Sequence, residues 1–394
     1  MQTSYLGHAL SPRVGEFIEL RRDIHAHPEL PFEEHRTSAL VARKLTEWGY
    51  DVTLGLGGTG VVGQLKRGSG SRSLGIRADM DALPIDEQTT NDWRSRHEGV
   101  MHACGHDGHT AILLAAARQI AEHADFHGTL NLIFQPAEEG AGGAVKMMAD
   151  GLFERFPCDA VFALHNMPGI EAGKFVFRTG PAMASSDDVF IVLEGIGGHG
   201  AMPHTCADPI VAASSIVLAL QTIVARNVSP LRTAVVTVGA LQAGKANNVI
   251  PQQACMALSV RALDREVRNL LKTRIVQLVE QQAASYQVKA RIDWRDGYSV
   301  LVNTPEETDL ATQVALDLFG SEWVVPQGEP MTASEDFAFM LEKVPGSYFQ
   351  VGNGAPGTPG ACMVHHPSYD FNDDLIDPAS RFWFALAERF LKAL

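Results

Sequence analysis

The sequence predicts an α/β fold in which a mostly parallel sheet carries helices on both faces and a smaller α+β domain is inserted into it. Apolar strand-like and helix-like stretches alternate through the first half of the chain, which is typical of such a sheet. Near residue 185 the order becomes strand–helix–strand–strand–helix–strand, as in a ferredoxin-like domain. The first alternation then resumes. We therefore expect a large domain from residues 1–184 and 299–394 and an inserted domain from residues 185–298.

The elements of the large domain follow one another with clear start and stop signals. A first helix is expected from residue 14 until Pro28 ends it, and a second over 37–49 with Thr37 as its N-cap. The remaining strands are expected over 73–81, 128–135, 159–166 and 346–354, and the remaining helices over 109–124, 144–151, 305–320 and 378–394. Strands that alternate with helices in this way pair in parallel.

The inserted domain is predicted to contain two long amphipathic helices and four strands. Apolar residues recur at helical spacing over 208–226 and 265–287. Strands are expected over 187–195, 233–244, 254–263 and 289–294. Two helices and four strands in this order are those of a ferredoxin-like α+β domain.

Composition excludes several classes of partner. The net charge of −14 argues against nucleic acid, since phosphate binding needs clustered Lys and Arg, and against anionic membranes. The start of the chain lacks the basic and apolar regions of a signal peptide. The five cysteines are an odd number spread over a long chain, so they form no disulfide framework. We expect a cytoplasmic protein without a nucleic acid or membrane partner.

Residues with metal-ligand chemistry follow the expected strands of the large domain. Because the carboxyl ends of parallel strands meet at one edge of a sheet, we expect these side chains to lie together. Two further candidates, Cys104 and His106, stand just before an apolar helix. The side chains that follow strands are Asp79, Asp81, Glu138, Glu139, His165, Asn166, His365 and His366.

Thiolate, imidazole and carboxylate groups together suit Zn²⁺, Mn²⁺, Co²⁺ or Ni²⁺. The donors exceed what one four-coordinate ion needs, and two ions about 3.5–4 Å apart would use them. Cys104 is placed to bridge such a pair. The side chains of Glu138 and Glu139 diverge, so one can bind metal while the other acts as general base, and spacing alone does not assign the roles. His102 and His109 are interpreted as structural.

Two other functional classes fit part of this pattern. A hydrolase with Cys104 as nucleophile would leave both glutamates, His165 and His365 without a role. A metal-binding module without catalytic activity would not need a second carboxylate beside the ligand, yet Glu138 and Glu139 stand side by side. A dinuclear metallohydrolase accounts for all of these residues.

Six ordered motifs, MHACGHDGH, QPAEEG, LHN, GGHGAMPH, NNVIP and HHPSYDFND, resemble the amidohydrolase branch of the M20 metallopeptidases. That branch includes hippurate hydrolases, N-acyl-amino-acid deacylases and auxin-conjugate hydrolases. The resemblance extends over nearly the whole chain. It implies cleavage of N-acyl amino acids, such as N-acetyl or N-benzoyl ones, to a carboxylic acid and a free amino acid. The alternative within the same fold is a metal-dependent dipeptidase or small-peptide carboxypeptidase.

The resemblance also implies roles for residues of the large domain, which would hold two divalent ions. Glu138 matches the general base, and Asp81 matches an aspartate that supports and orients the metal site. His365 is preferred over His366 because it matches the family's ligand before the variable residue and Pro. The implied ligands are Cys104 in the bridging place, His106, Glu139, His165 and His365.

The inserted domain resembles the family's lid and dimerisation domain. His199 matches a histidine that stabilises the oxyanion, commonly in the partner subunit's active site. Asn248 matches a substrate-contacting asparagine, and Arg261 is a weaker match to a group that binds the substrate carboxylate. A homodimer is implied, with a homotetramer as the alternative. The acyl group, the amino acid and the native metal are not indicated.

Overall fold

A computed structural model describes residues 14–392, which divide into two compact units. Unit 1 holds the described residues up to Gly180, then Val302–Glu329, and those from Asp336 onward. Unit 2 holds Pro181–Leu301 and Pro330–Glu335. The chain passes from one unit to the other within a few residues of the domain limits expected at 184 and 299. The assignment of Pro330–Glu335 to unit 2 was not expected. The expectation that the chain lacks a signal peptide rests largely on residues 1–13, which lie outside the described part of the chain.

Unit 1 is built on an eight-stranded sheet in the order β1-β2-β4-β3-β5-β16-β6-β15. The central neighbours β4, β3, β5 and β16 run parallel, whereas β1 and β2 add an antiparallel edge. Strands β3 and β5 are buried along their whole length, as expected of parallel strands covered on both faces. The strands are β1 (Asp51–Leu56), β2 (Gly60–Arg67), β3 (Ser73–Asp79), β4 (Gly128–Gln135), β5 (Ala160–Pro168), β6 (Phe175–Val176), β15 (Val324–Val325) and β16 (Gly346–Gly354).

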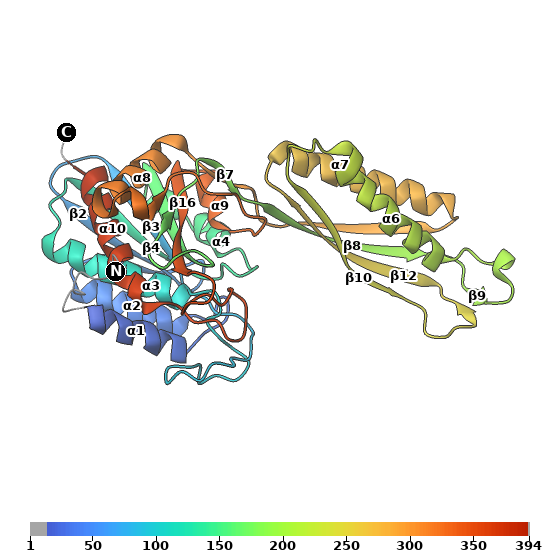
Figure 1. Cartoon of the computed structure of the whole chain (residues 1–394), viewed down its shortest axis with the longest axis horizontal. Helices are drawn as coiled ribbons and strands as arrows, with labels where there is room; N and C mark the ends of the chain where they lie inside the picture. The colour runs from blue at the N-terminus through green and yellow to red at the C-terminus, as the bar shows by residue number, and fades with distance from the viewer. Residues whose placement is uncertain (1–13, 393–394) are drawn as a thin grey trace. The chain divides into compact units, whose positions relative to one another are not determined.

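Helices cover both faces of this sheet (Figure 1). On one side α3 and α10 pack against each other and against β3, and on the other α4 and α9 pack against each other, with α4 on β4 and α9 on β5 and β16. The helices are α1 (Val14–Ala26), α2 (His35–Glu47), α3 (His106–His123), α4 (Gly143–Ala149), α5 (Leu152–Arg155), α8 (Pro305–Phe319), α9 (Phe337–Leu341) and α10 (Ile376–Phe390). The predicted α/β class with a mostly parallel sheet is confirmed.

The start of α2 differs from its prediction. The helix begins at His35, so Thr37 lies inside the first turn and is not the N-cap. The side chain of Glu29 accepts the backbone N–H groups of Arg36 at 2.7 Å and Thr37 at 2.9 Å. A carboxylate from the preceding loop therefore satisfies the helix N-terminus, which a search for a local Ser or Thr cap does not detect.

Unit 2 contains a four-stranded antiparallel sheet in the order β10-β12-β8-β13, with α6 and α7 on one face (Figure 1). Burial alternates along β8, since one face packs on the helices and the other meets solvent. The elements of unit 2 are β8 (Ser185–Glu194), β9 (Gly198–His199), α6 (Pro209–Asn227), β10 (Ala234–Ala243), β11 (Val249–Ile250), β12 (Gln253–Ala262), α7 (Arg265–Ser285) and β13 (Lys289–Asp296). Strands β7 (Gly180–Met183) and β14 (Leu301–Asn303) pair with each other, and each spans a boundary between the units. The ferredoxin-like order is confirmed.

Helix α6 has an unusually apolar surface. Its 19 residues, with a hydropathy of 1.6, are long and apolar enough to cross a membrane by length and composition, a test that core helices of folded domains also pass. Ala212, Ile216 and Leu220 are buried in the core of unit 2. On the outer side Val211 is 49% exposed and Leu218 is 73% exposed. One side of α6 therefore packs in the core of unit 2, and the other side exposes an apolar stripe that includes Val211 and Leu218.

Candidate active site

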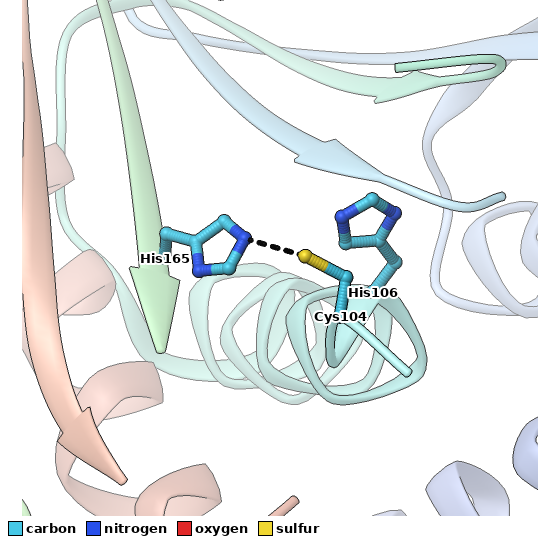
Figure 2. A group of neighbouring side chains, drawn as sticks. All are labelled: Cys104, His106 and His165. Carbon is cyan, nitrogen blue, oxygen red and sulfur yellow. Dashed lines mark hydrogen bonds between the residues drawn. The ribbon is translucent and has the colours of Figure 1, made fainter. Parts of the chain in front are cut away.

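The start of α3 and strand β5 bring three predicted ligands together (Figure 2). Cys104 and His106 come from the beginning of α3, and His165 projects from β5 toward them. The Cys104 Sγ lies 3.3 Å from His165 Nε2. All three residues are buried, so a bound ion would be largely screened from solvent.

Gly105 explains how Cys104 and His106 reach the same centre. Its φ of +91° lies in the left-handed region that favours glycine. A Cβ at this position would lie 2.3 Å from Asn166 Oδ1 and 2.4 Å from the Tyr369 hydroxyl. No other residue fits, so the glycine between the two ligands is required by both backbone conformation and space.

A second group of predicted ligands forms around the same thiol. Glu139 follows β4, and His365 lies in the loop after β16, where its Nε2 is 3.2 Å from Glu139 Oε1. Cys104, Glu139 and His365 have ligand atoms within 4.8 Å of one another, and so do Cys104, His106 and His165. Cys104 belongs to both groups. These groups could hold two neighbouring ions, with Cys104 available to both.

The backbone at His365 is held in an uncommon conformation. His365 has a φ of 65°, and its N–H donates to the carbonyl of Ala103 at 2.7 Å. Non-glycine residues in this region concentrate at functional sites, where the surrounding structure sustains the strain. The following residue, His366, receives the Ser368 N–H and contacts Cys362 through its Nδ1. This geometry supports the choice of His365 as the ligand.

The tautomers of the two buried histidines are set by their neighbours. His106 Nδ1 donates to the Asp81 carbonyl at 3.0 Å and lies 3.2 Å from Asp81 Oδ1, and His165 Nδ1 donates to the Asn166 carbonyl at 2.6 Å. In both rings Nε2 is therefore the nitrogen left to bind a metal once it carries no proton. Asp81 Oδ2 also accepts the N–H of Glu139 at 2.9 Å. Asp81 thus contacts two predicted ligands at once, which supports its orienting role.

The donor set fits divalent cations. Among the described residues, His106 Nε2 and Glu139 Oε1 are buried polar atoms that form no well-aligned hydrogen bond, although Oε1 lies 3.2 Å from His365 Nε2. Burial, followed by the carboxylates of Glu139 and Glu138, raises the pKa of the Cys104 thiol well above its ordinary value. Bound cations would reverse this effect, since a coordinating thiol is deprotonated outright. The centre combines excess negative charge with unsatisfied ligand atoms.

The histidines of the centre have opposite pKa shifts. Burial and the neighbouring His109 lower the pKa of His165 well below its ordinary value, so this ring is neutral and ready to bind metal. Burial opposes protonation of His106 too, but Asp79 and Asp81 overcome it and raise the pKa to about 10. Metal binding must therefore displace a proton from His106, which makes the affinity dependent on pH.

His109 and His102 have no place in either ligand group that contains Cys104. His109 Nδ1 lies 2.6 Å from Asp79 Oδ1, and its Nε2 lies 2.8 Å from Asn166 Oδ1, so both ring nitrogens are engaged. His102 is buried, and its ring nitrogens contact no polar partner among the described residues. Burial lowers the pKa of His102 to about 4. Both arrangements agree with structural roles.

Glu138 lies beside the ligands with its carboxylate partly committed. It is 7% exposed, and its Oε1 accepts the backbone N–H of Asp336 at 3.4 Å. Its ligand atom lies within 4.8 Å of those of His106 and Glu139. A carboxylate held here can reach a water molecule bound at the centre, which is the position a general base needs.

A buried charge network below the centre was missed by the sequence analysis. Arg77 donates to Asp79 at 2.7 Å, to Gln135 at 2.9 Å and to Asp336 at 3.2 Å. Asp336 also accepts the Ala144 N–H at 2.9 Å. An arginine inside the otherwise apolar strand over 73–79 was the available signal, because a buried charge needs partners. Nothing in the spacing of Asp336 pointed to its role.

In unit 2 the structure brings two of the three predicted substrate-side residues together. Strands β9 and β11 pair with Val249 opposite His199, and the Gly200 N–H donates to the Asn248 carbonyl at 2.8 Å. Arg261 lies near the far end of β12, where its Nη1 contacts the Thr332 carbonyl and the Ser334 hydroxyl. His199 and Asn248 are exposed, as groups that receive a ligand must be.

Comparison with known proteins agrees with this geometry. The family model of peptidase family M20/M25/M40 matches residues 75–389. The chain belongs to this peptidase family. A hippurate hydrolase from Campylobacter jejuni is 46% identical over 96% of this chain and 97% of its own. An N-acetyl-L-cysteine deacetylase from Bacillus subtilis is 41% identical over 97% of this chain and 90% of its own.

A solved structure extends the similarity to the fold. A dinuclear metal-binding peptidase of the M20 family from Bacillus subtilis superposes with a TM-score of 0.84, at 34% identity over 97% of this chain and 99% of its own. The family resemblance predicted from the six motifs is confirmed. This M20 protein is a metal-dependent hydrolase, and its clustered ligands are consistent with two divalent ions.

Proposed function

We propose that this M20 enzyme hydrolyses the amide bond of N-acyl amino acids and releases a carboxylic acid and a free amino acid. The observation that carries the proposal is the pair of ligand groups sharing Cys104, with Glu138 beside them as an additional carboxylate. The substrate class is supported by the two relatives, since hippurate and N-acetyl-L-cysteine are both N-acyl amino acids.

The chain supplies the ligands and the proton-transfer group for this reaction. Cys104, His106, Glu139, His165 and His365 would hold the two ions. Such ions lower the pKa of bound water toward about 7 and polarise a carbonyl group. Glu138 accepts the proton of the attacking water and returns it to the amide nitrogen as the C–N bond breaks. The backbone N–H of Asp336 holds one oxygen of that carboxylate.

Unit 2 supplies the substrate-side contacts in this proposal. His199 donates a hydrogen bond to the oxyanion that forms at the carbonyl, and Asn248 contacts the substrate. Their neighbouring positions on β9 and beside β11 support a joint role. Arg261 pairs with the substrate carboxylate, for which its guanidinium has the right geometry.

We further propose that the enzyme works as a homodimer joined through unit 2, with a homotetramer as the alternative. The apolar outer face of α6 and the edge strand β10 are the surfaces that support this assembly. All five cysteines are free, which favours the reducing cytoplasm as the place of action.

The decisive experiment removes the metal with a chelator and returns Zn²⁺, Mn²⁺, Co²⁺ or Ni²⁺ one at a time. Activity is measured on amino acids whose nitrogen carries an acetyl, a benzoyl or an indole-containing acyl group, and on dipeptides. We expect stripping to abolish hydrolysis of the N-acyl amino acids and at least one ion to restore it. Activity that survives complete stripping and is blocked by thiol reagents would instead support Cys104 as a nucleophile. Hydrolysis of dipeptides alone would support the peptidase alternative.

A further inference from the structure

Glu34 is a fully buried carboxylate of unit 1 that the proposed mechanism does not use. It occupies the N-cap position of α2, yet its side chain makes no capping bond, because Glu29 performs that role. Among the described residues no Lys or Arg forms a salt bridge with Glu34. Burying a carboxylate without a cation is unfavourable, so the contribution of Glu34 must come from its hydrogen bonds.

Those hydrogen bonds hold two residues in the same uncommon conformation. Glu34 Oε1 accepts the N–H of Phe32 at 3.0 Å and the N–H of Ala137 at 2.9 Å. Both are non-glycine residues in the left-handed region, with φ of 66° and 54°. The Thr59 hydroxyl donates to Oε2. A single carboxylate thus ties the loop before α2 to the loop after β4.

Ala137 directly precedes Glu138 in the loop after β4. The backbone conformation of Ala137 therefore sets the direction in which the Glu138 side chain points. An L-residue in the left-handed region relaxes to negative φ unless other contacts hold it. Three other contacts act on this loop: the Gly143 N–H binds the Ala137 carbonyl, the Glu139 N–H binds Asp81 Oδ2, and the Asp336 N–H donates to Glu138 Oε1 at 3.4 Å. None of them accepts the Ala137 N–H, so loss of the Glu34 contact would free the backbone at Ala137 and let Glu138 turn, while Glu139 stays attached to Asp81.

We propose that Glu34 is a positioning residue that holds Ala137 in the left-handed conformation and thereby aims Glu138 at the reacting centre. This inference rests on the proposed function through the role of Glu138 as general base. It separates two neighbouring tasks: Asp81 secures the ligand Glu139, and Glu34 secures the base Glu138. Damage to the Glu34 contact should lower kcat while both ions remain bound.

The first test compares three substitutions at Glu34 and its surroundings. Glu34→Leu removes every acceptor, and we expect kcat to fall by about 30-fold to 100-fold, with KM within about threefold and metal content unchanged. Glu34→Gln keeps one acceptor oxygen for Ala137, and its amide can donate to the Thr59 hydroxyl, so kcat should stay within about threefold. Glu29→Leu is the matched control. It removes the carboxylate that caps α2 and so lowers stability, but it does not remove any contact to the loop after β4 that contains Ala137.

A second test uses glycine at position 137. Glycine adopts positive φ without strain. The double variant Glu34→Leu/Ala137→Gly should therefore have a kcat at least about tenfold higher than that of Glu34→Leu, whereas Ala137→Gly alone should change the wild-type kcat little. The positioning role is wrong if the two substitutions act independently. It is also wrong if Glu34→Leu keeps full kcat or loses a metal ion. Glu34→Met replaces Glu34→Leu if the latter does not fold.

An activity-independent measurement keeps this proposal separate from the proposed function. Hydrogen exchange in metal-free protein follows the peptide over residues 136–140, in which the Ala137 N–H is bonded to Glu34. We expect about tenfold faster exchange at this amide in Glu34→Leu, and wild-type exchange in Glu34→Gln and Glu29→Leu. Unchanged exchange in Glu34→Leu would overturn the inference. If wild type hydrolyses no N-acyl amino acid, the proposed function fails while this measurement still decides the loop contact.

Discussion

At the scale of single residues, the centre depends on side chains that are fixed by backbone conformations most residues avoid. Gly105 has a positive φ, and a side chain there would collide with Asn166 and Tyr369, while His365, also at positive φ, donates its N–H to the Ala103 carbonyl. Such positions restrict the ligands before any metal binds. Preorganisation of this kind lowers the reorganisation needed during the reaction.

Glu138→Gln tests the proposed division of labour between the two glutamates. The amide cannot accept a proton, so we expect kcat to fall by about 10³-fold, within the range found for general bases. Metal content should remain two ions per subunit, because Glu139 is untouched. Glu154→Gln, on the exposed side of α5, serves as the control and should behave as wild type. Less than a tenfold loss in Glu138→Gln would show that another group takes the proton.

At the scale of elements, α1 and α3 are joined by a buried ion pair behind the metal centre. His25 Nδ1 lies 2.8 Å from Asp107 Oδ2, and Arg21 Nη1 lies 3.4 Å from the same oxygen. Asp107 directly follows the predicted ligand His106. The packing of α1 therefore affects the first turn of α3, which contains the predicted ligand His106 and follows Cys104 by two residues.

The His25 pair predicts a pH-dependent stability of the metal-free protein. Burial alone would lower the pKa of His25, but Asp107, helped by Glu87, raises it to about 9. Because the folded pKa exceeds the ordinary value of 6.5, the stabilisation is complete below pH 6.5 and is lost as pH rises through about 9. We expect His25→Gln to lower the free energy of unfolding by about 2–3 kcal/mol at pH 6 and by much less at pH 9.5.

Urea unfolding of the metal-free protein at several pH values measures this effect. His27→Gln is the matched control, since this residue directly follows α1, and its ring bonds the Asp23 carbonyl of that helix and, among the described residues, forms no hydrogen bond or ion pair with Asp107. It should keep the wild-type pH slope. A constant gap between His25→Gln and wild type across the whole range would contradict the predicted role of the protonated imidazole.

At the scale of the whole molecule, unit 2 offers two surfaces suited to self-association. The outer face of α6 exposes Val211 and Leu218, and β10 is an edge strand of the sheet. Apolar stripes and open strand edges commonly mark interaction surfaces in folded proteins. An isologous contact through them would give a closed dimer.

Leu218→Glu should convert the proposed dimer to a monomer. A carboxylate at the centre of the apolar stripe would be desolvated without a partner across the interface. Light scattering after size exclusion measures the mass directly. Leu54→Glu, at the similarly exposed edge of unit 1, provides the comparison and should not change the mass. A dimer that persists in Leu218→Glu would place the interface elsewhere.

A mixing experiment shows in which subunit His199 acts. If His199 serves the partner's centre, a heterodimer of His199→Ala and Glu138→Gln subunits contains one intact site. Equal mixing with subunit exchange should then restore about one quarter of wild-type activity, although each variant alone is nearly inactive. If His199 serves its own subunit, no site is complete and mixing restores nothing.

Local pattern was enough for most elements and for the types of ligand. Short apolar runs indicated the buried strands, a period of 3.6 residues indicated the long helices, and the placement of polar residues after strands indicated a shared edge. The β1–β2 hairpin was missed because its glycine-rich strands lack a strong apolar alternation. Glu34 and Asp336 were missed because neither stands near the motifs that they support.

The sequence by itself determined the α/β architecture, the inserted domain and the candidate metal donors, because each is encoded by residue type and local order. Only the tertiary structure decided that Cys104 is common to two ligand groups and that His109 has both ring nitrogens engaged. These outcomes depend on contacts between residues far apart along the chain. Spacing cannot report such contacts, since burial, hydrogen-bond geometry and backbone strain arise only when the strands and loops have assembled.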